Sequence, residues 1–179
     1  LAEEVWVIAP SEEHSGASHS LSLSKPLRME ERGPRRFAIG GTPTDCVMIA
    51  TRYLMKDYLP DLILSGVNWG QNIAEDISYS GTVAVAKEGT VSGIRSIAMS
   101  QTVSFADPNG FPDPRFEVAE KYAPDIIRKL LQADWKAGTL VNINFPHIEP
   151  HDEPAVRVTA QGKRDRSILG IDARLDPRG

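Results

Sequence analysis

Short apolar runs alternate along the chain with longer segments that have helical periodicity. Six runs have the length of β-strands, at residues 5–9, 37–39, 61–64, 96–99, 140–144 and 155–159. Several of them are apolar almost throughout, which is typical of strands buried on both faces of a parallel sheet. The intervening pattern predicts helices at residues 43–56, 81–91 and 116–133, the last with a kink at Pro124. This alternation predicts a doubly wound α/β fold with a mainly parallel sheet.

The start of the first predicted helix carries a capping signal. Thr42 precedes Pro43 at the first helical position, and Asp45 follows three residues after Thr42. A threonine and a carboxylate at this spacing satisfy free backbone N–H groups reciprocally. We therefore interpret Asp45 as part of a cap and not as a catalytic group, and Cys46 beside it as a small core residue.

Composition excludes several classes of function. The 179 residues are 41% hydrophobic, and a chain of this size can bury a core without metal or disulfide staples. The net charge is −4 and no basic stretch is concentrated, so we expect no nucleic-acid partner. Cys46 is the single cysteine, which favours a reducing, cytoplasmic location. No apolar run approaches the roughly 20 residues of a membrane span, so we expect no membrane partner.

The second predicted helix begins with small polar residues. Ser80, Gly81 and Thr82 offer two hydroxyls, backbone amides and a glycine that permits close approach. A phosphate group suits such a helix start, because the first N–H groups of a helix are free and carry partial positive charge. An ordinary serine cap followed by a packing glycine explains the same three residues, and on their own they favour that simpler interpretation.

Two further loops lie where α/β folds bind ligands, beyond the carboxyl ends of strands. The loop after residues 61–64 contains Asn68 and Asn72 with glycines between them, which indicates either a tight turn or a phosphate or metal site. Trp69 in this loop is placed to stack on a substrate base. The loop after the first strand contains Ser15, a hydroxyl ligand or a turn residue.

The candidate side chains in these three segments are all neutral. A divalent cation that activates water for phosphoryl transfer normally needs at least one carboxylate. Glu75 and Asp76 lie in the adjoining loop, where we expect them to be exposed to solvent. We therefore expect the carboxylates of such a site to come from a strand end outside this sequence.

Several spaced motifs together resemble the SurE family of metal-dependent nucleotidases. The matching blocks lie at residues 7–10, 15–18, 41–46, 61–68, 79–83 and 142–146. They occur in the order of the family over nearly the whole chain, and a set of spaced blocks is far more specific than any one of them. The resemblance implies a three-layer α/β/α Rossmann-like fold and hydrolysis of nucleoside 5′- and 3′-monophosphates with one Mg²⁺ or Mn²⁺ per subunit.

The resemblance also assigns roles to individual residues. Ser15 and Asn68 correspond to metal ligands of the family. The residues that correspond to phosphate contacts are Asn72, Ser80, Gly81 and Thr82. Among these, Asn72 and Ser80 are the expected catalytic residues. The nucleoside monophosphate is the expected partner, together with further copies of the chain in a homodimer or homotetramer.

The sequence departs from the family at one block. The family has an Asn-Asp-Asp-Gly block, whose aspartates bind the metal, at the end of its first strand, and this block does not occur here. We therefore expect residues 1–179 to form a single domain that lacks an N-terminal βα unit and the C-terminal elements of the family. Two alternatives stay open, a noncatalytic module that binds phosphate or nucleotides and an oligomerisation fragment without a function of its own.

Overall fold

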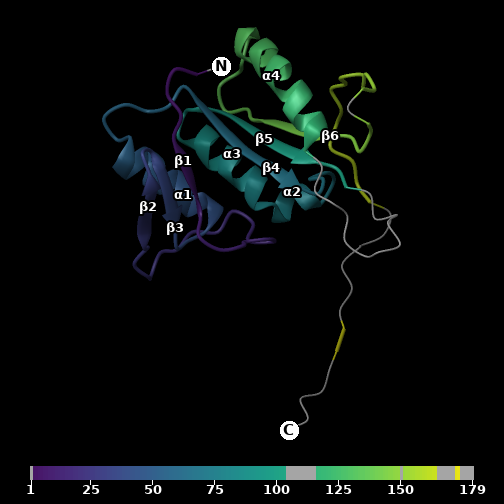
Figure 1. Cartoon of the computed structure of the whole chain (residues 1–179). Coiled ribbons are helices and arrows are strands. Elements are labelled where there is room, and N and C mark those ends of the chain that lie inside the picture. Colours follow the sequence, from purple (N-terminus) through teal and green to yellow (C-terminus); the bar gives the residue numbers. More distant parts are fainter. Residues whose placement is uncertain (1, 104–115, 150, 165–171, 174–179) are drawn as a thin grey trace.

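Two three-stranded sheets organise the protein (Figure 1). The computed structural model describes residues 2–103, 116–149, 151–164 and 172–173. One sheet has the order β4-β5-β6, with the bounds Leu62–Trp69, Arg95–Gln101 and Val141–Phe145. The other has the order β1-β3-β2, with the bounds Val7–Pro10, Arg36–Ile39 and Met29–Gly33. Only β2 and β3 pair antiparallel among the described strands, so the prediction of mainly parallel pairing is confirmed.

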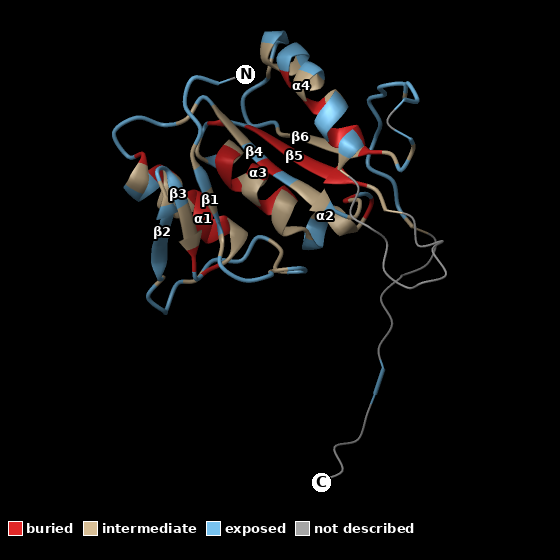
Figure 2. Ribbon diagram, viewed as in Figure 1, coloured by how far each residue is buried: buried red, intermediate tan, exposed pale blue. Residues whose placement is uncertain are grey.

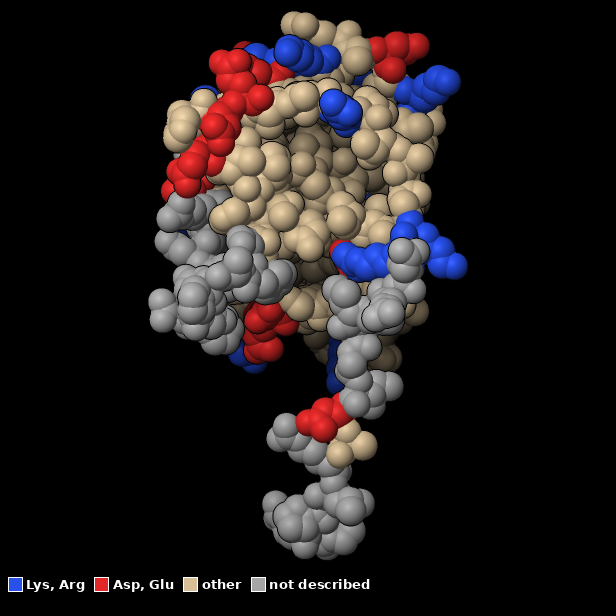
Figure 3. All heavy atoms as spheres, turned by 90° about the vertical axis from the view of Figure 1, so that its right-hand side faces the viewer, with Lys and Arg blue, Asp and Glu red and all other residues tan. Residues whose placement is uncertain are grey.

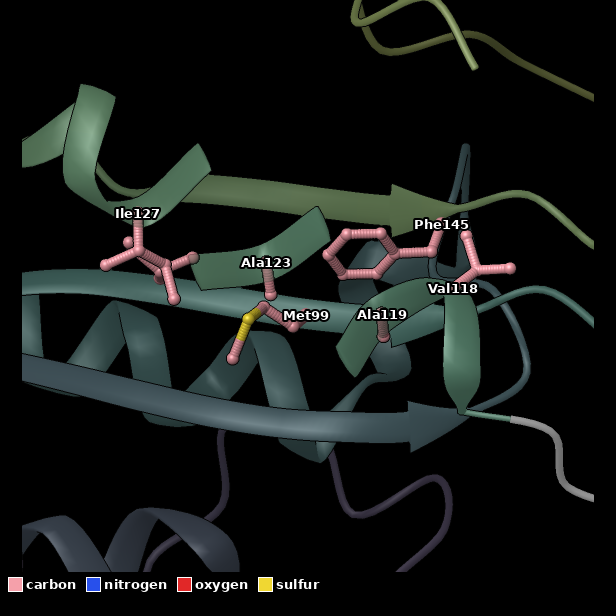
Figure 4. Close-up of a cluster of buried hydrophobic side chains, with 7 residues drawn as sticks. Met99, Val118, Ala119, Ala123, Ile127 and Phe145 are labelled. Carbon is pink, nitrogen blue, oxygen red and sulfur yellow. The ribbon is translucent and has the colours of Figure 1, made fainter. Parts of the chain in front are cut away.

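Strand β5 has helices on both of its faces, because successive side chains of a strand point in opposite directions. Ile97 and Met99 belong to a core cluster with α4 (Glu117–Gln132), whereas Ala98 packs against α3 (Gly81–Val91). Figure 4 shows the first cluster, in which side chains of α4 gather against Met99 and against Phe145 of β6. This arrangement gives the three layers, helix, sheet and helix, that the sequence predicts.

Burial differs between the strands (Figure 2). Six of the seven positions of β5 are buried, as expected for a strand covered on both faces. None of the four positions of β1 is buried, and Val7 is 45% exposed, so the same expectation is wrong for β1. The longest described helix, α4, has 16 residues, and no helix in the described ranges is both long and apolar enough to cross a membrane.

Glycine 89 sets the distance between α3 and the sheet. A Cβ atom at this position would lie 2.3 Å from Ser96 Oγ and 2.7 Å from Ile63 Cδ1. Both distances are shorter than real Cβ contacts, so the helix can approach β4 and β5 this closely only with glycine at residue 89. The approach of α3 to the sheet also places the start of the helix beside the end of β4.

The capping prediction is confirmed. Thr42 Oγ1 accepts a hydrogen bond from the N–H of Asp45, whose carboxylate accepts one from the N–H of Thr42. Helix α1 (Pro43–Ile49) begins there, but it continues as a π-helical turn, η1 (Ala50–Leu54), and not as α-helix to residue 56. Burial raises the pKa of the Cys46 thiol to about 12, which fits the prediction that it is a core residue.

Three parts of the fold differ from the sequence-based expectation. Strand β2 has an almost entirely exposed, charged sequence and no apolar run, so it forms through its pairing with β3. Residues 155–159 alternate like a strand but form none, and Val158 is fully exposed, because no described strand pairs with them. Residues 76–79 form a short helix, α2 (Asp76–Tyr79), that we expected to be a loop. The sequence at residues 107–114 is rich in turn formers, which is typical of a surface loop, and it lies outside the described residues.

Candidate functional site

All six residues that the sequence singles out line one pocket of about 870 Å³. They are Ser15, Asn68, Asn72, Ser80, Gly81 and Thr82. The pocket lies where β4 ends and α3 begins. Figure 3 shows the face at which β4, β5 and β6 end, and side chains in its centre are mostly uncharged, with charged residues mainly around the margin. The structure therefore brings the loop that contains Ser15 together with residues 68–72 and 80–82, which are more than 50 residues away in the sequence.

The start of α3 supplies free backbone donors to this pocket. Ser80 is the N-cap, because its Oγ accepts a hydrogen bond of 3.1 Å from the N–H of Val83. The next two N–H groups, those of Gly81 and Thr82, lie in the first helical turn, where α-helical geometry leaves them without a partner. A Cβ atom on Gly81 would lie 2.8 Å from Pro43 Cγ, so glycine allows this helix start to sit against α1. The cap interpretation of Ser80 is correct, and it is compatible with anion binding by the same turn.

Asn68 holds its amide group in a defined orientation. Its Nδ2 donates hydrogen bonds to the backbone oxygens of Gly70, at 2.8 Å, and Trp69, at 3.1 Å. Its Oδ1 faces the helix start, where it accepts a hydrogen bond of 3.2 Å from Thr82 Oγ1. The amide oxygen, which is the atom that a metal ion would bind, therefore lies on the side of α3.

Asn72 is fixed by a buried network of amide groups. The residue is 6% exposed, and its Nδ2 donates to Ser100 Oγ at 2.7 Å. Its backbone N–H donates to Asn144 Oδ1 at 2.8 Å. Its backbone oxygen accepts hydrogen bonds from Asn142 Nδ2, at 2.9 Å, and Asn144 Nδ2, at 3.1 Å. The ends of β5 and β6 thus hold the Asn72 loop at the pocket.

The sequence analysis did not assign a role to Ser100, Asn142 or Asn144. Asn142 and Asn144 appeared there only as part of a matching block. They lie two residues apart on β6, so both side chains point to the same face of the sheet. Two asparagines at this spacing in an otherwise apolar strand are a signal that could have indicated a polar network.

Ser15 lies in an exposed loop with few bonds. Its Oγ donates a hydrogen bond of 2.8 Å to the carboxylate of Glu13, which also lines the pocket. The loop is attached to the last two residues of α2 through Ser18, whose N–H donates to Tyr79 O at 3.0 Å and whose Oγ donates to Ser78 O at 2.8 Å. Glu13 is therefore a carboxylate beside a predicted metal ligand that the sequence analysis missed.

Asp76 and Glu75 are partly buried and bonded, so the expectation that they are exposed is wrong. The side chain of Asp76 is 23% exposed and makes two hydrogen bonds of 2.5 Å with the guanidinium of Arg164. These bonds lower the pKa of the Asp76 carboxyl. The Glu75 carboxylate accepts a hydrogen bond from the backbone N–H of Arg164. The Arg164 side chain is the one Lys or Arg among the described residues that line the pocket.

The donor set fits a hard divalent cation only in part. Within the ranges that the structure covers, no three His, Cys, Asp or Glu side chains are grouped closely enough to hold a metal ion. Ser15 Oγ and Asn68 Oδ1 are oxygen donors of the kind that Mg²⁺ and Mn²⁺ prefer, and both face the pocket. These two residues can therefore contribute neutral ligands to a cation that is also bound by other oxygens.

Trp69 and Tyr79 add aromatic surface to the pocket. Both line it, and they are 48% and 54% exposed. The prediction that Trp69 stacks on a base is compatible with this position and stays a prediction.

Comparison with known proteins finds relatives that match nearly the whole chain. The family model described as "Survival protein SurE" matches residues 1–167. The "5'-nucleotidase SurE" of Parvibaculum lavamentivorans is 49% identical over 178 residues, which are 99% of this chain and 63% of that protein. The protein of the same name from Azorhizobium caulinodans is 52% identical over 179 residues, which are 100% of this chain and 69% of that protein.

A solved structure shows the same fold. The crystal structure of the SurE protein from Aquifex aeolicus superposes with a TM-score of 0.77 at 38% sequence identity, over 88% of this chain and 62% of that one. This likeness confirms the prediction of an α/β Rossmann-like fold. The chain thus spans between 62% and 69% of the length of these three proteins. A family model that matches most of the chain, and relatives about half identical to it, confirm the resemblance drawn from the motifs, and the chain belongs to the SurE family.

Proposed function

We propose that this protein acts as a metal-dependent phosphomonoesterase that hydrolyses nucleoside 5′- and 3′-monophosphates to a nucleoside and phosphate. The observation that carries the proposal is the pocket itself, in which the free amides at the start of α3 face the same space as Asn72 and Asn68. The name 5'-nucleotidase of the relatives supports the choice of a nucleotide as the substrate.

In this proposal the start of α3 binds the phosphate. The N–H groups of Gly81 and Thr82 donate hydrogen bonds to phosphate oxygens. The Thr82 hydroxyl donates its one proton to Asn68 Oδ1 in the structure, and it turns that proton to the phosphate when Asn68 Oδ1 binds a cation instead. Ser80 Oγ already accepts a bond from Val83, so its own proton is available for the substrate. Asn72 and Ser80 then stabilise the negative charge that the equatorial oxygens carry in the transition state, because both are held in place before the substrate arrives.

Ser15 and Asn68 would hold one Mg²⁺ or Mn²⁺ per subunit. When bound, such a cation neutralises phosphate charge and lowers the pKa of a bound water. The contribution of Asn68 is its oriented Oδ1, which the two bonds of Nδ2 keep directed toward α3. The Glu13 carboxylate beside Ser15 adds negative charge at this edge of the pocket.

Release of phosphate from AMP and GMP in the presence of Mn²⁺ tests the proposal. The 179-residue chain is compared with the P. lavamentivorans relative as a positive control, and with its own Asn72→Ala and Asn68→Asp variants. Because Ser15 and Asn68 are both neutral ligands, we expect the chain to release phosphate more slowly than the relative, with a Mn²⁺-dependent release that falls in both variants. Unchanged turnover in both variants would remove these residues from the mechanism. Binding of phosphate or AMP without any turnover would instead support the noncatalytic binding module.

The proposal also covers the form of the substrate, the oligomeric state and the cellular location. We propose that its substrate is a single nucleotide and not a nucleic acid, and that it forms a homodimer or homotetramer in the cytoplasm. Light scattering of the purified chain checks the oligomeric state, and a monomer at all concentrations would contradict that part.

A further inference from the structure

Residues 151–164 reach the pocket from the far end of the described chain. Gln161 Nε2 donates a hydrogen bond of 2.9 Å to the backbone oxygen of Ala74. Three residues later, the backbone N–H of Arg164 lies 3.2 Å and 3.3 Å from the two carboxylate oxygens of Glu75. The Arg164 guanidinium then bonds Asp76 through both of its terminal nitrogens. This segment therefore holds three successive residues of the loop before α3, and the proposed chemistry uses none of these bonds.

Asp76 is directly connected to the residue that caps α3. Its backbone oxygen accepts a hydrogen bond of 2.9 Å from the N–H of Ser80, so the positions of the two residues are coupled. Asp76 is the first of the only four residues of α2, and Ser80 follows the last of them. A helix this short is not stable by itself, because its nucleation costs more free energy than its few hydrogen bonds return. Contacts from outside α2 must therefore hold it in place.

The ion pair of Asp76 with Arg164 has the geometry of a strong contact. Two parallel N–H···O bonds fix the relative orientation of the two groups as well as their distance. The side chains are 23% and 21% exposed, so water screens the pair less than an exposed surface pair. By contrast, Arg128 and Asp125 on α4 form an ion pair whose side chains are 56% and 74% exposed.

We propose that Arg164 is a positioning residue, whose ion pair with Asp76 holds α2 so that Ser80 and the amides of Gly81 and Thr82 are presented to the phosphate. The choice of phosphate as the ligand rests on the proposed function, whereas the ordering of α2 by Arg164 does not. A different role would be direct binding of the phosphate by Arg164, which also lines the pocket.

A double-mutant cycle separates positioning from direct contact. Binding of inorganic phosphate is measured for the wild-type chain, Asp76→Asn, Arg164→Gln and the double variant. If Arg164 acts through Asp76, each single variant weakens binding by a similar factor, about fivefold, and the double variant is no weaker than either. If Arg164 binds phosphate directly, Arg164→Gln weakens binding while Asp76→Asn leaves it unchanged or tightens it. That second outcome overturns the proposal.

Hydrogen exchange tests the ordering of α2 without any need for catalysis. We expect the amides of residues 76–83 to exchange faster, by a similar factor, in Asp76→Asn and Arg164→Gln. Arg164→Lys keeps the charge but not the paired bonds, so it should restore only part of the protection. The control is Arg128→Gln, which removes the exposed pair on α4 and should change neither exchange at 76–83 nor phosphate binding. Exchange that is the same in all variants would contradict the proposal.

The kinetics of AMP hydrolysis distinguish this proposal from the proposed function. With an active chain, Asp76→Asn and Arg164→Gln should raise KM about fivefold and also lower kcat, because they displace the phosphate-binding amides together with Ser80. A fall in kcat with unchanged KM would argue against positioning. If no form of the chain hydrolyses AMP but both variants still weaken phosphate binding equally, the nucleotidase proposal fails and the role of Arg164 stands.

Discussion

The two sides of the pocket differ in how firmly the fold holds them. The proposed phosphate side, made of Asn72 and the start of α3 at residues 80–82, is fixed by hydrogen bonds from β5 and β6 and by a helix cap. The proposed metal side contains Ser15, whose exposed hydroxyl bonds only the nearby Glu13 among the described contacts. Asn68 connects the two sides through Thr82.

This difference indicates where the fold has organised the site in advance. Donors that are already oriented before the substrate binds stabilise developing charge without a cost of reorganisation at that moment. On the phosphate side, the donors take up their orientation when the protein folds. On the proposed metal side, a cation would have to draw the exposed Ser15 loop into its final geometry when it binds. Changes on the phosphate side should therefore affect both stability and activity, and changes at Ser15 only ligand binding.

The largest effect is expected from Asn72→Ala. The variant removes a donor to the substrate and leaves Ser100 Oγ without the hydrogen bond it receives in the buried network. Turnover of AMP should fall about 100-fold, as for the loss of one donor to a charged transition state. The free energy of unfolding should fall by about 1–3 kcal/mol. Steady-state kinetics and urea unfolding measure the two effects, and a loss of activity with unchanged stability would contradict the network.

Asn144→Ala sharpens the comparison, because Asn144 acts on the phosphate side only through its hydrogen bonds to the backbone of Asn72. The substitution removes the acceptor for the Asn72 N–H and one donor to the Asn72 oxygen. We expect about 1–3 kcal/mol of destabilisation and a fall in turnover of about tenfold through misplacement of Asn72.

Asn142→Ala is the matched control for this change. Asn142 donates one hydrogen bond to the Asn72 oxygen, and its own buried Oδ1 has no hydrogen-bond partner among the described residues. Its removal should therefore cost less stability than that of Asn144. A larger loss for Asn142→Ala than for Asn144→Ala would show that the network is not centred on Asn72.

Ser15→Ala tests the metal side alone. Because Ser15 is exposed, the free energy of unfolding should change by no more than about 0.5 kcal/mol. If Ser15 is a ligand, the affinity for Mn²⁺, measured by calorimetry, should fall about tenfold, as for the loss of a group that supports metal binding. Unchanged Mn²⁺ affinity would remove Ser15 from the coordination shell, and a large loss of stability would remove the contrast between the two sides.

The smallest effect is the pH dependence of the Asp76 pair at the margin of the phosphate side. The hydrogen bonds from Arg164 hold the pKa of Asp76 below its usual value, so the charged form stabilises the folded state. This stabilisation is complete above the unfolded pKa of about 3.9 and is lost as the pH falls through the lower folded value. Arg164→Gln should therefore be less stable than the wild type at pH 7, by about 1 kcal/mol or less. This difference in stability should vanish in acid, and thermal unfolding of both forms from pH 7 to pH 2 measures it. A difference that stays constant over this range would show that Arg164→Gln destabilises the protein through lost packing and not through the lost ion pair.

The pattern of the sequence predicts most of the central fold. The apolar run at residues 96–99 predicts a strand buried on both faces, and β5 is that strand. Local pattern fails where pairing decides the structure. The charged segment of β2 becomes a strand because β3 pairs with it, and residues 155–159 have a strand-like alternation but no described partner. The short helix α2 depends on outside contacts in the same way.

For the site, the sequence by itself indicated six candidates, through small polar residues at helix starts and strand ends and through the family motifs, and all six line the pocket. Tertiary structure alone decided how they are held. Asn72 bonds Asn144, which is 72 residues away, and Asp76 bonds Arg164, which is 88 residues away. Partners this remote are chosen by which strand ends and segments lie side by side in the folded chain. Local propensities and spacing contain no information about that choice.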